Sequence, residues 1–320
     1  MAKPRKVPSP QRDKKEKAKS SGKNSAPEKE PYSMTTKVTV LGTVGLGIFL
    51  GVYFMPPIVI EESIYEAGLT VLASSTKTTP ISSYEVKCSD DYQQDTFYEC
   101  KPKFCGRVIM DGLVQEEEAK YLLGVAKKGL AYGGSSGGAS ILDLHSGALS
   151  KQDKFINIYS ILPEEGGFTE EDFNMYKKVK NKIQKAISKH FKIPLSSLYL
   201  TKPTFFSRMN TTEAKTVHDE YWHKHVDKIT YGSFHYTSLL YLSTYNEDFT
   251  GGRFIFVDNG KDEKTVEPRL GRVSFFTSGS ENVHYVEKLE SGIRYAITIS
   301  FTCDPDMAIN DPVVRQYNVK

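Results

Sequence analysis

The sequence predicts an α+β protein in which a jelly roll is buttressed by helices that precede it in the chain, with a single transmembrane helix before both. Three observations predict this class: one uncharged apolar run near the N-terminus, two later stretches with apolar residues at helical spacing, and a final part in which apolar and polar residues alternate. With 320 residues, 39% hydrophobic and 25% charged, the chain has room for one sizeable domain with appendages or for two small domains.

The N-terminal tail, residues 1–37, is strongly basic. It holds eleven Lys or Arg and four Asp or Glu, a net of +7, so the remainder of this +3 chain carries about −4. The basic character therefore belongs to a tail and not to a nucleic-acid groove, and we expect no nucleic-acid partner. We expect residues 1–37 to be a disordered cytosolic segment.

Residues 38–60 contain no charged side chain and predict one membrane crossing, because a helix of roughly 20 apolar residues spans the hydrocarbon core. Pro56 and Pro57 mark the end of the regular helix, and Glu61 and Glu62 follow it. With the Lys and Arg residues before the segment, the N-terminus is expected to stay in the cytosol. The long basic region and the lack of an Ala-x-Ala site favour an uncleaved signal-anchor over a signal peptide. This predicts a type II membrane protein with its main domain in the ER or Golgi lumen.

All four cysteines follow the membrane segment, an even number that suits two disulfides in an oxidising lumen: Cys88, Cys100, Cys105 and Cys303. Their spacing is not that of a zinc finger, and the pairing stays open. Asn210-Thr211-Thr212 is a glycosylation sequon on the same side of the membrane. Residues 61–106 are predicted to comprise a Ser/Thr-rich stem and, from Cys88 to Gly106, a disulfide-tied stretch that we call the cysteine segment.

Residues 107–197 are predicted to be a helical support region. Glu116–Leu130 has apolar residues at helical spacing and is followed by the loop "GGSSGG". Thr169 is the expected N-cap of the clearest helix, which runs to Phe191. Its apolar stripe consists of Phe173, Tyr176, Val179, Ile183 and Ile187, with His190 at the edge of the stripe.

From about Leu198 the period changes to two, and turn signals separate short runs rich in aromatic and β-branched residues. The runs are "LYLTKPTFFSR", "YTSLLYLS", "GRFIFV", "KTVEP", "GRVSFFTS", "NVHYVEKL" and "IRYAITISFTC". Residues 198–304 are therefore the predicted jelly roll, whose mouth gathers side chains from several strands. Residues 305–320 are a predicted C-terminal tail.

A candidate metal site lies in "HKHVDKITYG", residues 223–232. In a strand, His225 and Asp227 would share a face because they are two positions apart. His284, in a later predicted strand, adds a second imidazole. Two histidines and one carboxylate on one face of an octahedron leave three positions open, the arrangement typical of non-heme Fe(II) oxygenases.

Arg294 supplies what a 2-oxo acid cosubstrate needs, since a permanently charged planar guanidinium can hold a carboxylate with two hydrogen bonds. In the last predicted strand Arg294, Ala296, Thr298 and Ser300 form one face, which we expect to line the cavity. The opposite face is the expected core side and consists of Ile293, Tyr295, Ile297, Ile299 and Phe301.

These residues and the passage "YLSTYNEDFTGGRFIF…TVEPRLGRVSFFTSGSENVHYVEKLESGIRYAITISF" resemble the 2-oxoglutarate/Fe(II)-dependent dioxygenases, in particular the prolyl 4-hydroxylase-like branch. The resemblance covers about residues 107 to 303. It implies a double-stranded β-helix, Fe(II) held by His225, Asp227 and His284, 2-oxoglutarate held by Arg294, and ascorbate as a helper. Two positions depart from the family: Ala296 replaces a frequent Ser or Thr, and Arg294 replaces the Lys of prolyl 4-hydroxylases proper.

The resemblance implies an oxidoreductase that hydroxylates a protein or peptide side chain in the lumen with O₂, releasing succinate and CO₂. Pro and Lys side chains are the first candidate targets. An alternative is a catalytically inactive lumenal binding or scaffold protein on an oxygenase fold, but the intact ligand set argues against it. A jelly roll that binds another metal would leave Arg294 unexplained.

Several polar side chains compete with these assignments. His218-Asp219-Glu220 offers another His-x-acid triplet, which we expect to be loop or surface. His223 could replace His225, or touch the substrate at the rim. His145 and His235 have no partner at ligand spacing and are expected to be structural. Further candidates for the cavity wall are Tyr221, Trp222 and Arg208.

Overall fold

The computed structural model describes residues 69–162 and 167–313. The chain divides into two units, residues 1–63 and 64–320, and every described residue belongs to the second. The predicted cytosolic tail (1–37) and transmembrane anchor (38–60) lie outside the described residues. No helix among the residues that the structure does describe is long and apolar enough to cross a membrane.

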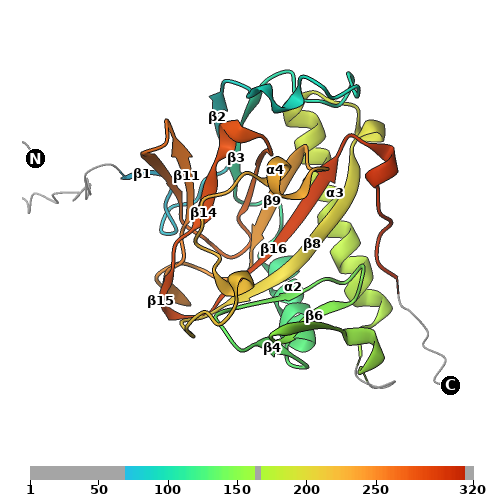
Figure 1. Ribbon diagram of the computed structural model, residues 1–320, viewed down its shortest axis with the longest axis vertical. Coiled ribbons are helices and arrows are strands. Elements are labelled where there is room, and N and C mark those ends of the chain that lie inside the picture. The colour runs from blue at the N-terminus through green and yellow to red at the C-terminus, as the bar shows by residue number, and fades with distance from the viewer. Residues whose placement is uncertain (1–68, 163–166, 314–320) are drawn as a thin grey trace, which may run out of the picture. The chain divides into compact units, whose positions relative to one another are not determined.

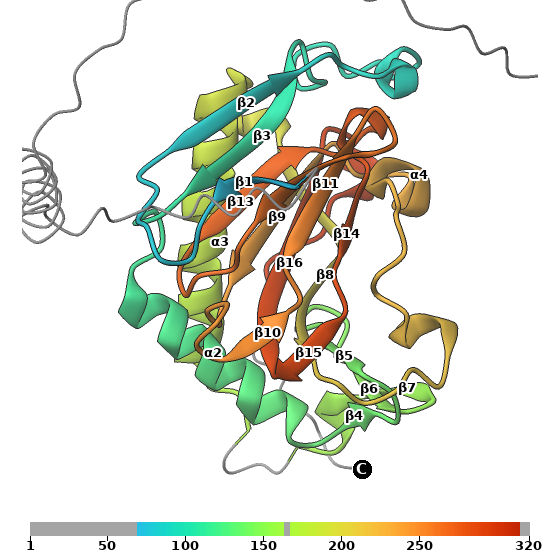
Figure 2. The same ribbon diagram turned by 90° about the vertical axis from the view of Figure 1, so that its left-hand side faces the viewer.

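The second unit is built from two main sheets and two long helices (Figures 1 and 2). The large sheet has the order β2 (Ser82–Val86), β3 (Cys105–Met110), β13 (Val273–Thr277), β9 (Tyr236–Tyr241), β16 (Arg294–Thr302), β8 (Tyr199–Met209), β5 (Ala139–Leu142), β6 (Ala148–Gln152), β4 (Gly134–Ser135), with β7 (Lys154–Asn157) also on β6. The small sheet has the order β1 (Leu69–Ala73), β12 (Asp262–Val266), β11 (Phe254–Asp258), β14 (His284–Val286). A ribbon of β10 (Phe249–Gly251) and β15 (Leu289–Gly292) extends it.

The two long helices, α2 (Glu116–Leu130) and α3 (Glu170–Phe191), cover one face of the large sheet (Figure 2). Both match the predicted ranges, because their apolar stripes bury against the sheet. Thr169 caps α3 as predicted: its hydroxyl accepts from the Asp172 N–H, and the Asp172 carboxylate accepts from the Thr169 N–H.

The other face of the large sheet packs on the small sheet through a second apolar core. Phe276 and Tyr241 of the large sheet meet Phe254, Phe256 and Val266 of the small sheet, all nearly inaccessible. Two facing sheets of mostly antiparallel strands confirm the predicted jelly roll. The functional side chains described below line a cavity next to this core.

All seven predicted β runs contain strands, but two details differ. The run "NVHYVEKL" divides into β14 and β15, and β10 forms where a turn was predicted. The reason is a tight connection at Gly251 and Gly252, with φ of +66° and +63°, where the Gly252 N–H donates to the Lys288 carbonyl. This connection also places the Gly252 carbonyl beside Arg294.

The predicted stem is wrong for residues 69–86, because this stretch contains two strands of the fold. β1 pairs in parallel with β12, and β2 pairs with β3. Ala73 packs in the core between the sheets, and its carbonyl accepts from Arg272. Most Ser and Thr residues in this stretch are at least partly exposed, so composition alone suggested a linker.

Two further boundaries shift. The support region 107–197 is not purely helical, since it contains most of β3 and all of β4–β7, and β5 pairs with β8 of the predicted jelly roll. The C-terminal tail follows the surface as far as the structure describes it. Ile309 donates its N–H to the Leu200 carbonyl, and Asp311 forms an ion pair with Lys180.

Two disulfides use all four cysteines: Cys88–Cys105 and Cys100–Cys303. The first joins the start of the cysteine segment to β3. The second joins its middle to the residue after β16. The cysteine segment is thereby tied at two places to the large sheet.

Candidate metal centre

His225 and Asp227 do not lie in a strand, so the predicted local structure of residues 223–232 is wrong. His225 forms an isolated antiparallel bridge with His284, and Asp227 begins the short helix α4 (Asp227–Tyr231). Val226 is extended, with φ −122° and ψ 124°, and precedes the helix. One extended residue followed by a helical turn still directs both side chains to one place, so the predicted pair lies together although the predicted strand is absent.

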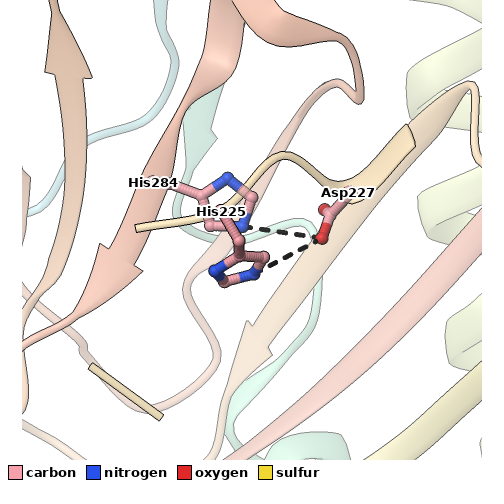
Figure 3. Close-up of side chains that lie close together, drawn as sticks. All are labelled: His225, Asp227 and His284. Carbon is pink, nitrogen blue, oxygen red and sulfur yellow. Dashed lines mark ion pairs between the residues drawn. The ribbon is translucent and has the colours of Figure 1, made fainter. Parts of the chain in front are cut away.

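The three predicted ligands meet in space (Figure 3). One ligand atom from each of His225, Asp227 and His284 lies within 4.8 Å of the other two. The Nε2 atoms of His225 and His284 each lie 3.6 Å from Asp227 Oδ1. Three donor atoms at this spacing can surround a single ion at ordinary metal–ligand distances of about 2 Å.

Neighbouring groups orient each ligand. His225 Nδ1 lies 3.0 Å from the His223 carbonyl, and His284 Nδ1 lies 2.8 Å from the Asn282 carbonyl. A carbonyl only accepts, so each Nδ1 carries the proton and each Nε2 keeps a free lone pair. Thr237 donates to Asp227 Oδ2 at 2.6 Å, which leaves Oδ1 facing the imidazoles.

Burial differs among the three side chains. Asp227 and His284 are each 4% exposed, whereas the His225 side chain is 34% exposed. Burial lowers the pKa of His284 to about 4, although the Asp227 carboxylate acts in the opposite direction. His284 is therefore neutral at physiological pH, the form that binds a metal.

A cavity of about 360 Å³ contains the three ligands and Arg294 in its lining. Most of the remaining wall is apolar and includes Pro203, Phe205 and Leu239. The strand register places the ligands and Arg294 at different levels of β16: Thr237, which holds Asp227, pairs with Ser300, and Arg294 lies further along the same strand. Such a chamber has room for a small diacid between the ligands and Arg294.

Arg294 is 1% exposed, yet its Nη2 has no hydrogen-bond partner in the described chain. Its Nε donates to the Gly252 carbonyl at 2.9 Å, and no described carboxylate lies within ion-pair distance. Burial lowers the pKa of Arg294. A buried guanidinium with an unused donor is costly for the protein alone, and a ligand carboxylate would satisfy it. The residues present therefore fit a 2-oxo diacid.

The two faces of β16 follow the predicted alternation near the site. Arg294 and Thr298 line the cavity, and Ala296 belongs to the core between the sheets. Ile297, Ile299 and Phe301 pack toward the helices. A register irregularity between Thr298 and Ser300 leaves this alternation intact, because the extra residues lie in the partner strand β8.

The competing side chains have other tasks. His223 is exposed and pairs with Glu220 at 2.6 Å, so it is not a ligand. Asp219 lies in the loop before the site, one of the two placements expected, but it is buried and accepts hydrogen bonds from Ser135 and from the Thr216 N–H. The reason is that it fastens the loop before the site to β4.

Other expectations are met in part. His145 bonds to the Tyr176 hydroxyl and His235 to Asp95, so both are structural in the described chain. Tyr221, one of three candidates for the cavity wall, does line the cavity, and its hydroxyl accepts from the Leu289 N–H. Arg208 is not in the cavity wall, because residues 203, 205, 207 and 209 of β8 face the cavity and Arg208 faces away toward Ser140. Trp222 packs against Lys288.

Sequence reasoning missed Thr237, which fixes the Asp227 carboxylate. The alternation of β9 contained the signal, since Thr237 and Leu239 share a face and both line the cavity. It also missed Phe155 of β7, which lines the cavity. β7 and β6 form a hairpin that follows the "GGSSGG" loop in the chain.

A family model described as the 2OG-Fe(II) oxygenase superfamily matches residues 207–302, which include the three clustered side chains and Arg294. The chain is 54% identical over 272 residues to the Xenopus tropicalis protein named 2-oxoglutarate and iron-dependent oxygenase domain-containing protein 3. That match covers 84% of each of the two chains.

More distant likenesses are to prolyl hydroxylases. Rat (Rattus norvegicus) prolyl 3-hydroxylase 1 is 27% identical over 237 residues, 67% of this chain and 31% of the rat protein. A solved prolyl hydroxylase from Trichoplax adhaerens, in complex with a peptide fragment of the hypoxia inducible factor oxygen degradation domain, is 16% identical. The match covers 61% of this chain and 83% of that one, with a TM-score of 0.41.

Proposed function

This chain belongs to the 2OG-Fe(II) oxygenase superfamily and is a 2-oxoglutarate- and Fe(II)-dependent dioxygenase, and we propose that it hydroxylates a protein or peptide side chain in the secretory lumen. The observation that carries the site assignment is the pairing of two features in one cavity. One is the cluster of His225, Asp227 and His284, and the other is the unsatisfied guanidinium of Arg294.

In this proposal His225 Nε2, His284 Nε2 and Asp227 Oδ1 hold Fe(II), and Arg294 holds the distal carboxylate of 2-oxoglutarate. The bound metal and cosubstrate supply the oxidising chemistry, in which one atom of O₂ enters the substrate and the other enters succinate as CO₂ leaves. Ascorbate serves as an accessory reductant.

The contribution of the chain is to orient these groups and to keep water away. Two backbone carbonyls fix the tautomers of the imidazoles, and Thr237 fixes the Asp227 carboxylate. The rings of Phe254 and Phe276 lie 5.1 Å from the His284 ring and shield it from solvent. A dry and preorganised site of this kind favours controlled oxidation of a bound substrate.

The charge of the cavity favours an uncharged target. Its lining contains one acidic side chain, Asp227, and one guanidinium, Arg294, and both have assigned tasks. No other lining carboxylate is left to pair with a substrate ammonium group. The walls next to the ligands are apolar, with Pro203, Phe205 and Tyr231 among them. This supports a neutral side chain such as that of proline over lysine.

Membrane anchorage through residues 38–60 and a lumenal catalytic domain complete the proposal. The basic tail before the apolar segment and the acidic pair after it support this orientation. Two disulfides and no free cysteine in the described chain support an oxidising compartment.

The test uses the full chain purified in detergent, with Fe(II), ascorbate and peptides that differ in one target residue, proline or lysine. We expect succinate to form from 2-oxoglutarate and the proline peptides to gain the mass of one oxygen atom. Asp227→Ala should abolish succinate formation, whereas Asp90→Ala, at an exposed acid that bonds Gln93, should not. Turnover that persists in Asp227→Ala rejects the site, and peptide binding without any turnover supports the scaffold alternative.

A further inference from the structure

The segment that carries two of the three ligands has little regular structure of its own. His225 belongs to an isolated bridge, and Asp227 to a five-residue helix. A helix this short is not stable in isolation, so contacts with the rest of the protein must fix its position. Thr237 holds the Asp227 carboxylate itself, and the contacts of Lys228, the residue after Asp227, help to hold the backbone of Asp227 in place.

Lys228 is anchored by the cysteine segment. Its Nζ donates to Asp95 Oδ2 at 2.9 Å and lies 5.2 Å from the centre of the Tyr92 ring. The side chain of Lys228 is 10% exposed and that of Asp95 is 19% exposed, so the pair is largely shielded from water. Shielded charge pairs with hydrogen bonds hold their geometry better than exposed ones.

Asp95 has a second partner on the large sheet. The same Oδ2 lies 3.0 Å from Nε2 of His235, which immediately precedes β9. Although burial acts to raise it, hydrogen bonds from His235 and Lys228 lower the pKa of Asp95 to about 2. Asp95 is therefore ionised and joins α4 to the strand that carries Thr237.

The cysteine segment also holds the loop that leads to His284. The Gly279 N–H donates to the Tyr92 hydroxyl at 2.6 Å, and the Tyr92 hydroxyl donates to Glu281 at 3.0 Å. The Ser280 N–H donates to Asp91. Asn282, whose carbonyl orients His284, directly follows this held stretch.

The cysteine segment is covalently anchored on both sides of the residues that make these contacts. Cys88–Cys105 and Cys100–Cys303 enclose Asp91, Tyr92 and Asp95 between bonds to β3 and to the residue after β16. One covalently anchored element thus contacts both stretches that supply metal ligands. The cysteine segment therefore holds both ligand-bearing stretches in place, which an isolated surface loop would not do.

We propose that the cysteine segment is a positioning element of the metal centre and that Asp95, through Lys228, is the residue that sets the position of Asp227. This inference rests on the proposed function, because it presumes that the three ligands hold a metal. Asp95 does not line the cavity, and its side-chain hydrogen bonds go to Lys228 and His235 and not to the three ligands, so we infer that it acts on the site through these two residues.

Metal affinity tests the proposal directly. Mn(II) serves as a redox-stable probe for the Fe(II) site, and the loss of its free electron paramagnetic resonance signal reports binding to the full chain in detergent. Asp95→Asn should weaken Mn(II) affinity by roughly tenfold, the lower end of what removal of supporting groups costs a metal site. Asp90→Asn is the matched control, since it makes the same change in the same segment at an exposed side chain.

A second variant covers the case in which Asp95→Asn folds poorly. Lys228→Met removes the charge but keeps an apolar stem over Tyr92, and it leaves Asp95 paired with His235. It should weaken Mn(II) binding to a similar degree. The double variant should lose less than the sum of the two single losses, because both act through one contact.

A kinetic comparison separates positioning from general loss of structure. Asp95→Asn should raise the Fe(II) concentration needed for half-maximal 2-oxoglutarate turnover and leave the KM for 2-oxoglutarate, which depends on Arg294, unchanged. Wild-type Mn(II) affinity in both Asp95→Asn and Lys228→Met, with affinity lost in Asp227→Ala, overturns the inference and spares the proposed function. Absence of Asp227-dependent Mn(II) binding in the wild-type chain overturns both.

Discussion

His225 and His284 are joined backbone to backbone: each N–H donates to the carbonyl of the other, at 2.9 and 3.0 Å. Their rings lie with centroids 4.3 Å apart. The spacing of the two imidazoles is therefore set by main-chain hydrogen bonds between a loop and β14, and not by flexible side chains alone. Asp227 completes the set from the helix that follows directly.

Replacement of Arg294 should separate stability from cosubstrate binding. Because its Nη2 is buried without a partner, we expect Arg294→Met to change the free energy of unfolding by no more than about 1 kcal/mol, in either direction. The KM for 2-oxoglutarate should rise by roughly a hundredfold, as a lost charged hydrogen-bond pair predicts. Chemical denaturation and succinate assays measure the two effects. A large loss of stability with an unchanged KM would contradict the assignment.

The stability of the metal-free protein should depend on the protonation of His284. Its pKa is about 4 in the folded protein and about 6.5 when unfolded, so below pH 6.5 the unfolded chain takes up a proton that the folded chain refuses. This stabilisation is complete above pH 6.5 and is lost as the pH falls to 4, an effect of up to about 3 kcal/mol. Unfolding with chelator present, at pH 7 and pH 5, measures it. His284→Asn should show a shallower slope, and an equal slope in both proteins would refute this account.

The two disulfides should differ in their effect on stability. Cys100 and Cys303 are 203 residues apart, whereas Cys88 and Cys105 are 17 apart. Loop-closure entropy then predicts upper limits of about 5 and about 3 kcal/mol for their loss. Paired Cys→Ser variants, compared by urea denaturation, test this order. A greater loss from the Cys88 and Cys105 pair would show that contacts of the segment outweigh chain entropy.

Gly251 should be more sensitive to alanine than Gly260. Both have positive φ, +66° and +75°, but a Cβ at Gly251 would lie 2.3 Å from the Lys288 carbonyl oxygen, whereas nothing lies within 4 Å of one at Gly260. Gly260→Ala should cost about 1 kcal/mol for backbone conformation alone, and Gly251→Ala more. Gly251→Ala should also raise the KM for 2-oxoglutarate, because Gly252 supports Arg294. Equal costs at the two sites would contradict the steric argument.

Glycosylation provides a test of membrane orientation. Asn210-Thr211-Thr212 contains the acceptor asparagine at the end of β8, and attachment of an N-glycan requires the lumen. We expect an endoglycosidase-sensitive shift in electrophoretic mobility when the chain is expressed in cells. Thr212→Ala should remove the shift, and Thr211→Ala, which keeps the sequon, should not. A chain without the shift would argue against lumenal placement of this domain.

The sequence predicted those parts of the fold in which the local pattern and the burial agree. α2 and α3 carry continuous apolar stripes, and β16 alternates between core and cavity, so their ranges and faces were readable. The strands β1 and β2 could not be predicted from the sequence, because short edge strands with partly exposed Ser and Thr resemble a linker until their partners are known. Parallel pairing of β1 with β12 depends on a contact across most of the chain.

At the site, the clustering of His225, Asp227 and His284 was easier to predict than the local structure. The His-x-Asp pair and Arg294 were recognisable because their chemistry is specific. The turn into α4 was not, since it depends on Lys228 reaching Asp95 and on Thr237 reaching Asp227. Such tertiary hydrogen bonds override the local preference of a polar stretch, and a single sequence does not display them.

The three predicted ligands are unequally exposed to solvent, and the exposed one marks the side of the centre that faces water. In the folded protein Asp227 and His284 are almost fully buried, whereas about a third of the His225 side chain is exposed to water. Of the three side chains, His225 is therefore the one that an ion in bulk water can contact directly. We therefore expect a chelator to approach a bound ion from the side of His225.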